Sequence, residues 1–379
     1  ALLAAVLRRG TVSCPDMGAL SAKMDNLYDA SIDYTVRKKG ENQCVGFVAS
    51  FIDDRYAPDG ERLLEPAAAL LGELICDPVT YHGRFVPEYF ESEKTNLLEA
   101  IRSLINDKRD WADSRLLRAL CDGEAYAVPR LGDEETVDKL QALKVYTQYR
   151  DLISTAPLEI IYSGSADLER VKQALAAAFA TLPREEVRVI STAAPHVCRE
   201  SVQHVEDVLD VTQGKLGMGF SCGSDDMPAL LMGNTLFGGS SNSKLFLNVR
   251  EKLSLCYYAS SLYHRQKGLI TVSSGIEFQN YQRAYDEIMA QLEAVQKGEL
   301  EDWELEGARS TLLNNYATVG DSQGKLENFY LGQAATGQHE TPADLARAIQ
   351  DMTAERICRA MSTVKLDTVY FLKGKEAEA

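Results

Sequence analysis

The spacing of the histidines shows whether a local sequence motif could bind a catalytic metal. There are five, namely His82, His196, His204, His264 and His339. None of them forms an HxxEH, HExxH or HxxxH pattern, so no helix presents two imidazoles one turn apart. We therefore expect each histidine to lie at the surface or at a strand end, although ligands from distant parts of the chain could still converge on a metal.

Nucleophile motifs do not occur either. The sequence has no Gly-x-Ser-x-Gly elbow, and no cysteine stands in a recognisable catalytic context. The run Gly238-Gly239-Ser240-Ser241-Asn242-Ser243 has the composition of a phosphate-binding loop, but it lacks a Gly-Lys-Ser/Thr ending and a preceding βαβ unit. We interpret it as a turn whose Ser or Asn caps the helix that starts at Lys244.

Composition limits the partners of this chain. Its 40 Lys and Arg against 56 Asp and Glu give a formal charge of −16, which repels phosphate backbones and anionic lipid. We therefore expect neither nucleic acid nor a membrane surface as a partner. An acidic surface favours basic or unstructured peptides, but acidity also serves solubility alone.

Cysteine usage and apolar patterning indicate a cytoplasmic protein. The 8 cysteines are scattered, without the CxxC or close pair of a disulfide framework or a sulfur-ligated metal. No apolar run approaches the roughly 20 residues that span a bilayer, and the opening stretch Ala1–Leu7 is too short for a signal peptide. Because the sequence lacks a starting Met and begins inside this stretch, we expect a further segment to precede it.

Hydrophobic periodicity predicts helices and strands in mixed order over 379 residues, enough for two ordinary domains. Helices are expected over residues 1–7, 15–28, 63–75, 86–105, 110–121, 135–150, 167–179, 279–297 and 300–317. Strands are expected over residues 32–37, 44–52 and 158–162, in a strand-rich stretch over 208–221 and in a later pair. The proline-containing stretch Pro183–Ser201 is the best candidate for a linker.

The second half repeats the order of features found in the first. The matched residues are Leu7 with Leu236, Gly10 with Gly239, Tyr28 with Tyr257, Ala30-Ser31 with Ala259-Ser260, and Lys39-Gly40 with Lys267-Gly268. Around them both halves read apolar helix, Gly turn, helix, Tyr-x-Ala-Ser, strand, Lys-Gly turn, strand. We therefore predict a duplicated α+β half of ordinary domain size.

One stretch of the second half carries a specific motif. From Leu236 to Tyr257 the chain reads LFGGSSNSKLFLNVREKLSLCY, a glycine turn followed by a helix that ends in Arg-Glu-Lys-x-x-Leu-x-Tyr. This stretch resembles the carboxy-terminal-half signature of the insulinase, or pitrilysin, family of zinc peptidases (M16). In that family the Arg and Tyr reach toward the substrate beside the zinc, which implies substrate-binding roles for Arg250 and Tyr257. The alternative is a helix-end Arg and a strand-start Tyr that bind no ligand.

The start of the chain resembles the zinc helix of the same family without its ligands. Active members read His-Phe-Leu-Glu-His shortly before Gly-Thr, whereas this chain reads Ala-Leu-Leu-Ala-Ala from its first residue. The resemblance places Ala1 and Ala5 at the zinc histidines and Ala4 at the general-base glutamate. The third ligand, a glutamate on a later helix, corresponds to Ala100 in the segment Glu93–Ile101.

Alanine at these positions removes the chemistry of the family. A methyl group has no lone pair for zinc and no proton to shuttle. Because peptide hydrolysis of this type needs a metal-polarised water and a base, we expect no catalytic residue, no metal site and no cofactor. Glu93 and Glu99 remain near, but without a histidine before His82 we interpret them as solvated or outer carboxylates.

The resemblance spans essentially the whole chain and is greatest to inactive bacterial members that lack the HxxEH motif. In two-subunit members, one chain carries the zinc and the other contributes Arg and Tyr to a shared chamber. The first hypothesis is therefore a non-catalytic subunit that binds extended peptide and completes the active site of a zinc-bearing partner chain. The second is a scaffold or homodimeric interaction protein, and the third is an active zinc endopeptidase whose ligands are unrecognised or were replaced by alanine through engineering.

The resemblance also implies an α+β fold of the LuxS/metallopeptidase-like type. Two homologous halves, each a mostly antiparallel sheet with helices packed on one face, are expected to face each other around a cavity. The N-terminal domain would cover residues 1–185, the linker 186–202 and the C-terminal domain 203–379. A peptide in such a cavity would add a strand to an exposed sheet edge, which demands little sequence specificity.

Overall fold

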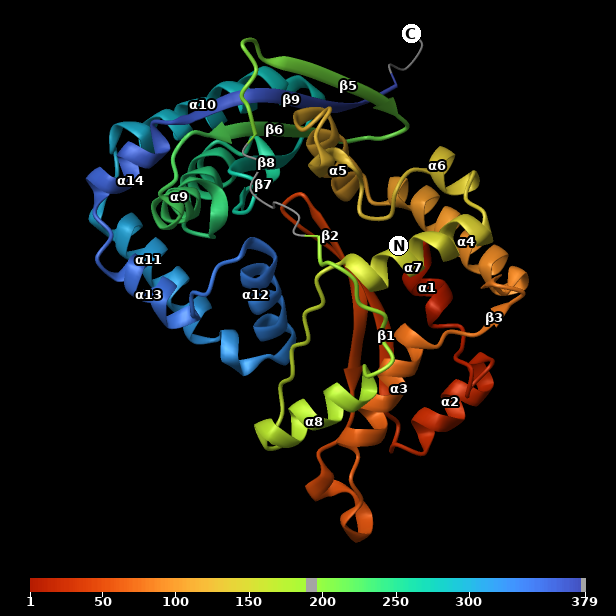
Figure 1. Cartoon of the computed structure of the whole chain (residues 1–379). Helices are drawn as coiled ribbons and strands as arrows, with labels where there is room; N and C mark the ends of the chain where they lie inside the picture. Colours follow the sequence, from red (N-terminus) through yellow and green to blue (C-terminus); the bar gives the residue numbers. More distant parts are fainter. Residues whose placement is uncertain (189–195, 376–379) are drawn as a thin grey trace. The chain divides into compact units, whose positions relative to one another are not determined.

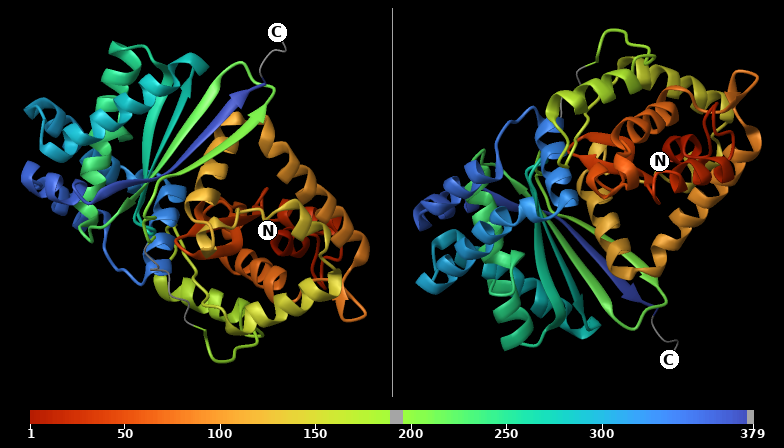
Figure 2. Two further views of the ribbon diagram at one scale, coloured as in Figure 1. Left: turned by 90° about the horizontal axis from the view of Figure 1, so that it is seen from above. Right: turned by 90° about the horizontal axis from the view of Figure 1, so that it is seen from below.

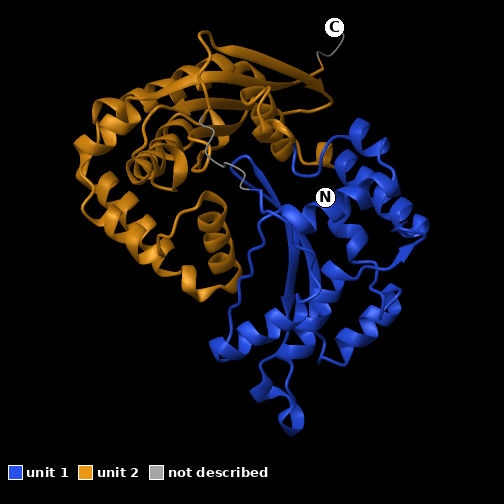
Figure 3. Cartoon of the chain, viewed as in Figure 1, with its two compact units in different colours: residues 1–103, 129–190 blue, residues 104–128, 191–379 orange. Residues whose placement is uncertain are grey.

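The computed structural model describes residues 1–188 and 196–375 (Figure 1). The chain divides into two compact units, unit 1 from residues 1–103 and 129–190 and unit 2 from residues 104–128 and 191–379 (Figure 3). Both units mix helices and strands, so the predicted α+β class is confirmed. Within the described residues, no helix has both the length and the hydropathy of a membrane span.

Unit 1 is mainly helical and contains two antiparallel hairpins. Strand β1 (Ser31–Lys39) pairs with β2 (Asn42–Ser50), and the short β3 (Thr80–Tyr81) pairs with β4 (Arg84–Phe85). Gly40 makes the first turn with a φ of 59°, a left-handed conformation that favours glycine. The helices are α1 (Leu2–Leu7), α2 (Met17–Asp25), η1 (Asp54–Tyr56), η2 (Pro58–Gly60), α3 (Leu64–Cys76), α4 (Pro87–Ser103), α6 (Glu134–Asp138), α7 (Ala142–Thr155) and α8 (Leu168–Ala178).

Small apolar cores hold these helices together. Helix α1 buries Leu2, Val6 and Leu7 in a cluster with aromatic residues of β4, α4 and α7. Helix α3 packs against α8 through Gly72, where a Cβ atom would overlap the carbonyl oxygen of Ala178. The close helix approach therefore depends on glycine at this position.

The strand predicted over residues 158–162 is wrong. Residues 157–163 form no regular structure, and the described strands of unit 1 make only two-stranded hairpins. The apolar and aromatic residues there have the composition of a strand, but a strand also requires a hydrogen-bonded neighbour. A larger sheet is thus present among the described residues of unit 2 only.

Unit 2 is built on a five-stranded sheet with the order β5-β9-β6-β8-β7. Strands β5 and β9 run parallel, and the other neighbours are antiparallel, so the sheet is mostly antiparallel as predicted. The strands are β5 (Gln203–Leu209), β6 (Gly214–Cys222), β7 (Cys256–His264), β8 (Leu269–Ile276) and β9 (Val364–Gly374).

Helices cover both faces of this sheet, whereas the sequence predicted one covered face (Figure 2). Leu216, Met218 and Phe220 of β6 point into the main core, which also contains apolar residues of α9, α10, α11 and α14. Gly217 and Gly219 alternate with them and face Leu116 and Leu120 of α5. The helices of unit 2 are η3 (Leu104–Asn106), α5 (Lys108–Leu120), η4 (Ala125–Ala127), α9 (Met227–Asn234), η5 (Thr235–Gly239), η6 (Leu245–Lys252), η7 (Phe278–Asn280), α10 (Tyr281–Lys297), α11 (Asp302–Ala317), η8 (Val319–Asp321), α12 (Gln323–Thr336), α13 (Pro342–Gln350) and α14 (Ala354–Met361).

The observed units differ from the predicted domains in the place of α5. The sequence assigned residues 104–128 to the N-terminal domain, 1–185, but α5 packs on the sheet of unit 2. Glycines at two alternate positions of β6 leave room for it, because a Cβ on Gly219 would lie 2.7 Å from a methyl carbon of Leu120. The predicted linker 186–202 includes residues 189–195, which lie outside the described residues.

The order of elements agrees with the repeat seen in the sequence. Unit 1 begins with helices α1 and α2, hairpin β1–β2 and helix α3, and unit 2 contains η5, η6, hairpin β7–β8 and helix α10 in the same order. Gly40 and Gly268 both have positive φ in the two hairpin turns, at 59° and 66°. Duplication of an ancestral half stays a prediction that these shared features favour.

Candidate functional site

Arg250 and Tyr257 line the same surface pocket of unit 2, which has a volume of about 450 Å³. The sequence singled out these two residues, and the structure brings them together at the end of η6 and the start of β7. The remaining lining residues are Glu251, Ser254, Leu255, Cys256, Glu277 and Asn280.

The glycine turn before η6 lets the chain approach β7 closely. A Cβ on Gly238 would lie 2.8 Å from the backbone nitrogen of Ser261, so only glycine fits without moving the strand. The Oγ of Ser243 accepts a hydrogen bond from the backbone N–H of Phe246 at 3.4 Å. This contact is the one that the predicted capping Ser before Lys244 would make.

A buried ion pair fixes the start of the helix that carries Arg250. The Lys244 ammonium lies 3.0 Å from each carboxylate oxygen of Glu304 on α11, and both side chains are about nine-tenths buried. The segment that follows, η6, has π-helical hydrogen bonding, which occurs frequently at functional sites. Arg250 is thus presented by a helix anchored at its beginning.

The Arg250 side chain is held from one side and open on the other. Its guanidinium carbon lies 4.7 Å from the centre of the Phe246 ring, and its Nε lies 3.6 Å from a Glu251 carboxylate oxygen. The side chain is 40% exposed. Because a guanidinium offers five N–H donors, it can still donate to a carbonyl or carboxylate oxygen of a ligand.

Tyr257 points outward because β7 contains a bulge at this residue. The pairing of β7 with β8 shifts between Cys256 and Tyr258, which leaves Tyr257 without an opposite residue and 61% exposed. The preceding Ser254 has a φ of 49°, in the left-handed region. By contrast, Tyr258 packs its ring 4.4 Å from the guanidinium carbon of Arg109 on α5.

The pocket contains groups for binding but no activated nucleophile. Burial raises the pKa of the Cys256 thiol, and the hydrogen bond with Ser274 and the charge of Arg250 oppose this only in part. The thiol therefore stays protonated near neutral pH, where it is a poor nucleophile. Arg250 and Tyr257 can instead bind a peptide through hydrogen bonds and ring contacts.

The positions that correspond to the zinc ligands hold only methyl groups. Ala4 and Ala5 lie on α1 and are 0% and 7% exposed, and Ala100 is exposed near the end of α4. None of the predicted positions Ala1, Ala4, Ala5 and Ala100 has a side-chain donor atom, so these residues do not fit a zinc ion. The interpretation of α1 as a zinc helix without ligands agrees with this arrangement.

The nearby glutamates are not arranged as replacement ligands. A carboxylate oxygen of Glu93 lies 3.4 Å from the Arg9 guanidinium, which also donates to Ser92 and lies 5.3 Å from the centre of the Tyr89 ring. The Glu99 side chain belongs to an exposed residue of the same helix. Glu93 thus serves as the partner of an arginine.

The structure brings together one cluster that the sequence missed. Cys121, Glu124 and His196 are the only group of three or more potential metal ligands within the described residues, with donor atoms within 4.8 Å of one another. His196 was expected at the surface, and this is wrong because its side chain is 3% exposed. His196 is distant in sequence from Cys121 and Glu124, so a search for motifs of fixed spacing could not find the cluster.

The other histidines lie where the sequence placed them. His82, His204 and His339 are exposed. His264 ends β7 and shares hydrogen bonds with Tyr126 at 3.0 Å and Thr271 at 2.9 Å.

Comparisons with known proteins identify the family. The model for the Peptidase M16 inactive domain matches residues 139–312. A protein of Bacillus subtilis strain 168, described as the probable inactive metalloprotease YmfF, is 35% identical over 99% of this chain and 89% of its own length. The chain belongs to the M16 peptidase family. The family predicted from the two motifs is therefore confirmed.

Solved structures agree with the M16 assignment. A conserved protein from Enterococcus faecalis V583 superposes with a TM-score of 0.88 and 25% identity, over 100% of this chain and 90% of the other. The peptidase M16 inactive domain from Pseudomonas fluorescens shares the fold, with a TM-score of 0.77 and 18% identity over 100% of this chain and 89% of that one.

Proposed function

We propose that this M16 homologue is non-catalytic, binds extended peptide at the Arg250 and Tyr257 pocket, and completes the active site of a zinc-bearing partner chain. The observation that carries the proposal is the contrast between its two units. The positions of the metal ligands and the base are alanine, while the Arg and Tyr of the family signature line one accessible pocket. In this proposal the two halves enclose a chamber, the partner supplies the zinc, and the chain itself needs no cofactor.

Strand β7 supports the binding of extended peptide. It is the outer strand of the sheet and begins at the pocket, and among the described strands it pairs only with β8. An outer strand can accept the backbone of a peptide as an additional strand, with pockets reading alternate side chains. The net charge of −16 favours basic peptides among those that fit.

Peptide binding can be measured without the partner. A fluorescently labelled, unstructured basic peptide is titrated with the whole chain, and anisotropy reports the dissociation constant. Arg250→Ala should weaken binding by about tenfold or more, because a hydrogen bond to a charged group contributes about 1.5–3 kcal/mol. Arg347→Ala is the matched control, since Arg347 is exposed on α13 and does not line the pocket.

Complementation requires the second chain. A zinc-bearing M16 chain that co-purifies with this protein from its native host is mixed with it, and cleavage of the same peptide is followed. We expect no cleavage by this chain alone, cleavage by the mixture, and a large loss of cleavage with Arg250→Ala or Tyr257→Ala. Unchanged cleavage by the mixture with Arg250→Ala would overturn the shared site, and peptide binding that is absent altogether would favour a scaffold role.

A further inference from the structure

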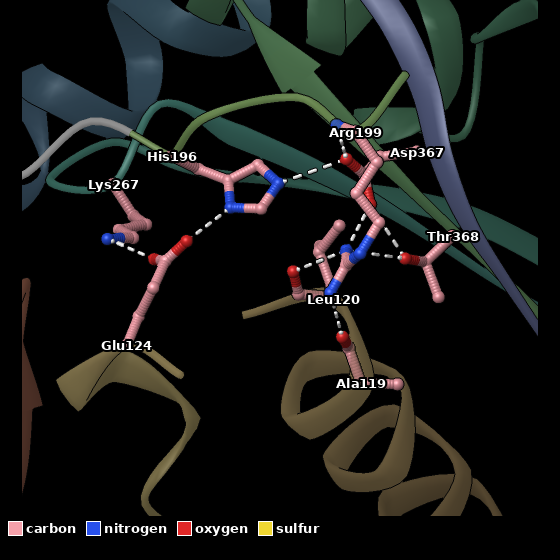
Figure 4. A network of polar contacts seen from close by, with 8 residues as sticks. All are labelled: Ala119, Leu120, Glu124, His196, Arg199, Lys267, Asp367 and Thr368. Atoms are coloured by element: carbon pink, nitrogen blue, oxygen red, sulfur yellow. Dashed lines mark hydrogen bonds and ion pairs between the residues drawn. The ribbon is translucent and has the colours of Figure 1, made fainter. Parts of the chain in front are cut away.

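His196 lies between two carboxylates inside unit 2 (Figure 4). Its Nδ1 is 2.6 Å from a carboxylate oxygen of Glu124, and its Nε2 is 3.2 Å from Asp367. Each ring nitrogen of His196 therefore faces a carboxylate oxygen, and either nitrogen can bind a hydrogen or a metal ion.

Rigid elements hold the groups around this position. Cys121 ends helix α5 and is 0% exposed, and Glu124 precedes the short helix η4. Asp367 lies on β9, fully buried, and accepts hydrogen bonds from the backbone N–H and the guanidinium of Arg199 at 2.7 and 2.6 Å. The same guanidinium donates to the last carbonyl oxygens of α5, at Ala119 and Leu120.

We propose that Cys121, Glu124 and His196 bind a divalent transition metal such as Zn²⁺, at a site distinct from the degenerate zinc helix. Thiolate, carboxylate and imidazole are the ligands that zinc takes in proteins, and their donor atoms lie within 4.8 Å of one another. The metal would take the place of the proton at His196 Nδ1. The Nε2–H would then donate to Asp367, the carboxylate contact that orients metal-binding histidines.

The surrounding charges are compatible with a bound cation. A thiolate from Cys121 and the carboxylates of Glu124 and Asp367 supply three negative charges, which offset all but one of the four positive charges on Zn²⁺, Arg199 and Lys267. Lys267 lies 2.5 Å from the other oxygen of Glu124, so it contacts the carboxylate on the side away from His196.

The metal would connect two chain segments next to the five-stranded sheet of unit 2. The first segment contains the ligands Cys121 and Glu124, which follow α5. The second begins with the ligand His196, the first described residue after the gap at 189–195. A metal bound to all three would join these segments, and binding to the folded state alone stabilises unit 2 by mass action. Its function is therefore structural and does not depend on the proposed peptide binding.

The test is metal content and spectroscopy of the whole chain. The purified protein is loaded with zinc, desalted and analysed for metal, and a second sample is loaded with Co²⁺. We expect about one zinc per chain and a thiolate-to-cobalt charge-transfer band in the near ultraviolet. Cys121→Ala and His196→Gln should lose both, and Asp367→Asn should weaken the affinity about 10–100-fold.

Matched controls make the assignment specific. Cys358→Ala changes a partly exposed cysteine of unit 2, and His204→Gln changes an exposed histidine of β5, so both should keep the metal and the band. The proposal is overturned if the loaded wild-type chain retains no zinc or shows no thiolate band, which needs no variant to fold. It is also overturned if Cys121→Ala or His196→Gln retains the metal.

Discussion

The buried Lys244–Glu304 pair offers a quantitative test of how the Arg250 helix is held. Both carboxylate oxygens of Glu304 lie 3.0 Å from the Lys244 ammonium, and the side chains are 7% and 10% exposed. Lys244→Met leaves the Glu304 carboxylate buried without its cation. Removing one partner of a buried pair destabilises a protein by about 3–5 kcal/mol.

This loss should be visible in the melting temperature of unit 2. For a domain of this size, 1 kcal/mol shifts the midpoint by roughly 2–4 °C, so Lys244→Met should lower it by about 6–20 °C. Glu304→Gln still accepts the capping hydrogen bond from the Glu301 backbone, which separates the charge effect from the cap. The double variant, which removes both charges, should recover at least half of the loss because no buried charge remains.

Differential scanning calorimetry on the wild type, both single variants and the double variant completes the cycle. Lys297→Met is the control, because its ion pair with Glu293 on α10 is more than half exposed and contributes little. A melting temperature of Lys244→Met within about 2 °C of the wild type would refute the reasoning. So would a double variant as unstable as the single one.

Three further predictions concern stability and reactivity. Hydrogen bonds from Arg170 lower the pKa of Glu65 to about 2 from an ordinary value of about 4.3. This pair therefore stabilises unit 1 above pH 4.3, and the contribution is lost as the pH falls toward 2. In Arg170→Ala, the free energy of unfolding measured by urea denaturation should fall less steeply over this acid range, which is the acid limb of the stability curve. Gly72→Ala should destabilise unit 1 by about 1–3 kcal/mol in the same assay, because the added methyl overlaps a carbonyl of α8. Burial raises the pKa of Cys222 to about 12, so mass spectrometry should find it unalkylated by iodoacetamide at pH 8 in the native protein.

Each of these predictions has an internal control. Arg102→Ala removes an exposed ion pair with Glu134 and should leave the acid limb as in the wild type. Gly46→Ala adds a methyl that meets no atom within 4 Å, and it should change stability far less than Gly72→Ala. Urea should make Cys222 reactive, and rapid native alkylation of this thiol would contradict the burial argument.

Local sequence patterns predicted many elements of this fold. The helix over residues 279–297 corresponds to α10 (Tyr281–Lys297), and the hairpin predicted around Gly40 is β1–β2. Amphipathic periodicity and a glycine in a turn are local properties, so one chain segment suffices to read them. The segment 158–162 failed because strand formation depends on a neighbour that its own residues do not specify.

The candidate sites differ in the same way. Arg250 and Tyr257 were found because they belong to one continuous motif, and the structure adds the bulge that turns Tyr257 outward. The cluster around His196 joins the end of α5 and the turn that follows it to a residue 72 positions further along the chain. Only the folded arrangement of unit 2 brings those groups within reach of one another.

The most direct test of the central claim is a peptidase assay on the chain alone and mixed with its zinc-bearing partner, using the wild type and Arg250→Ala. We predict no cleavage by the chain alone, even with added zinc, cleavage by the wild-type mixture, and little cleavage by the mixture that contains Arg250→Ala. Chelator-sensitive cleavage by the chain alone would contradict it, as would a mixture that is indifferent to Arg250→Ala.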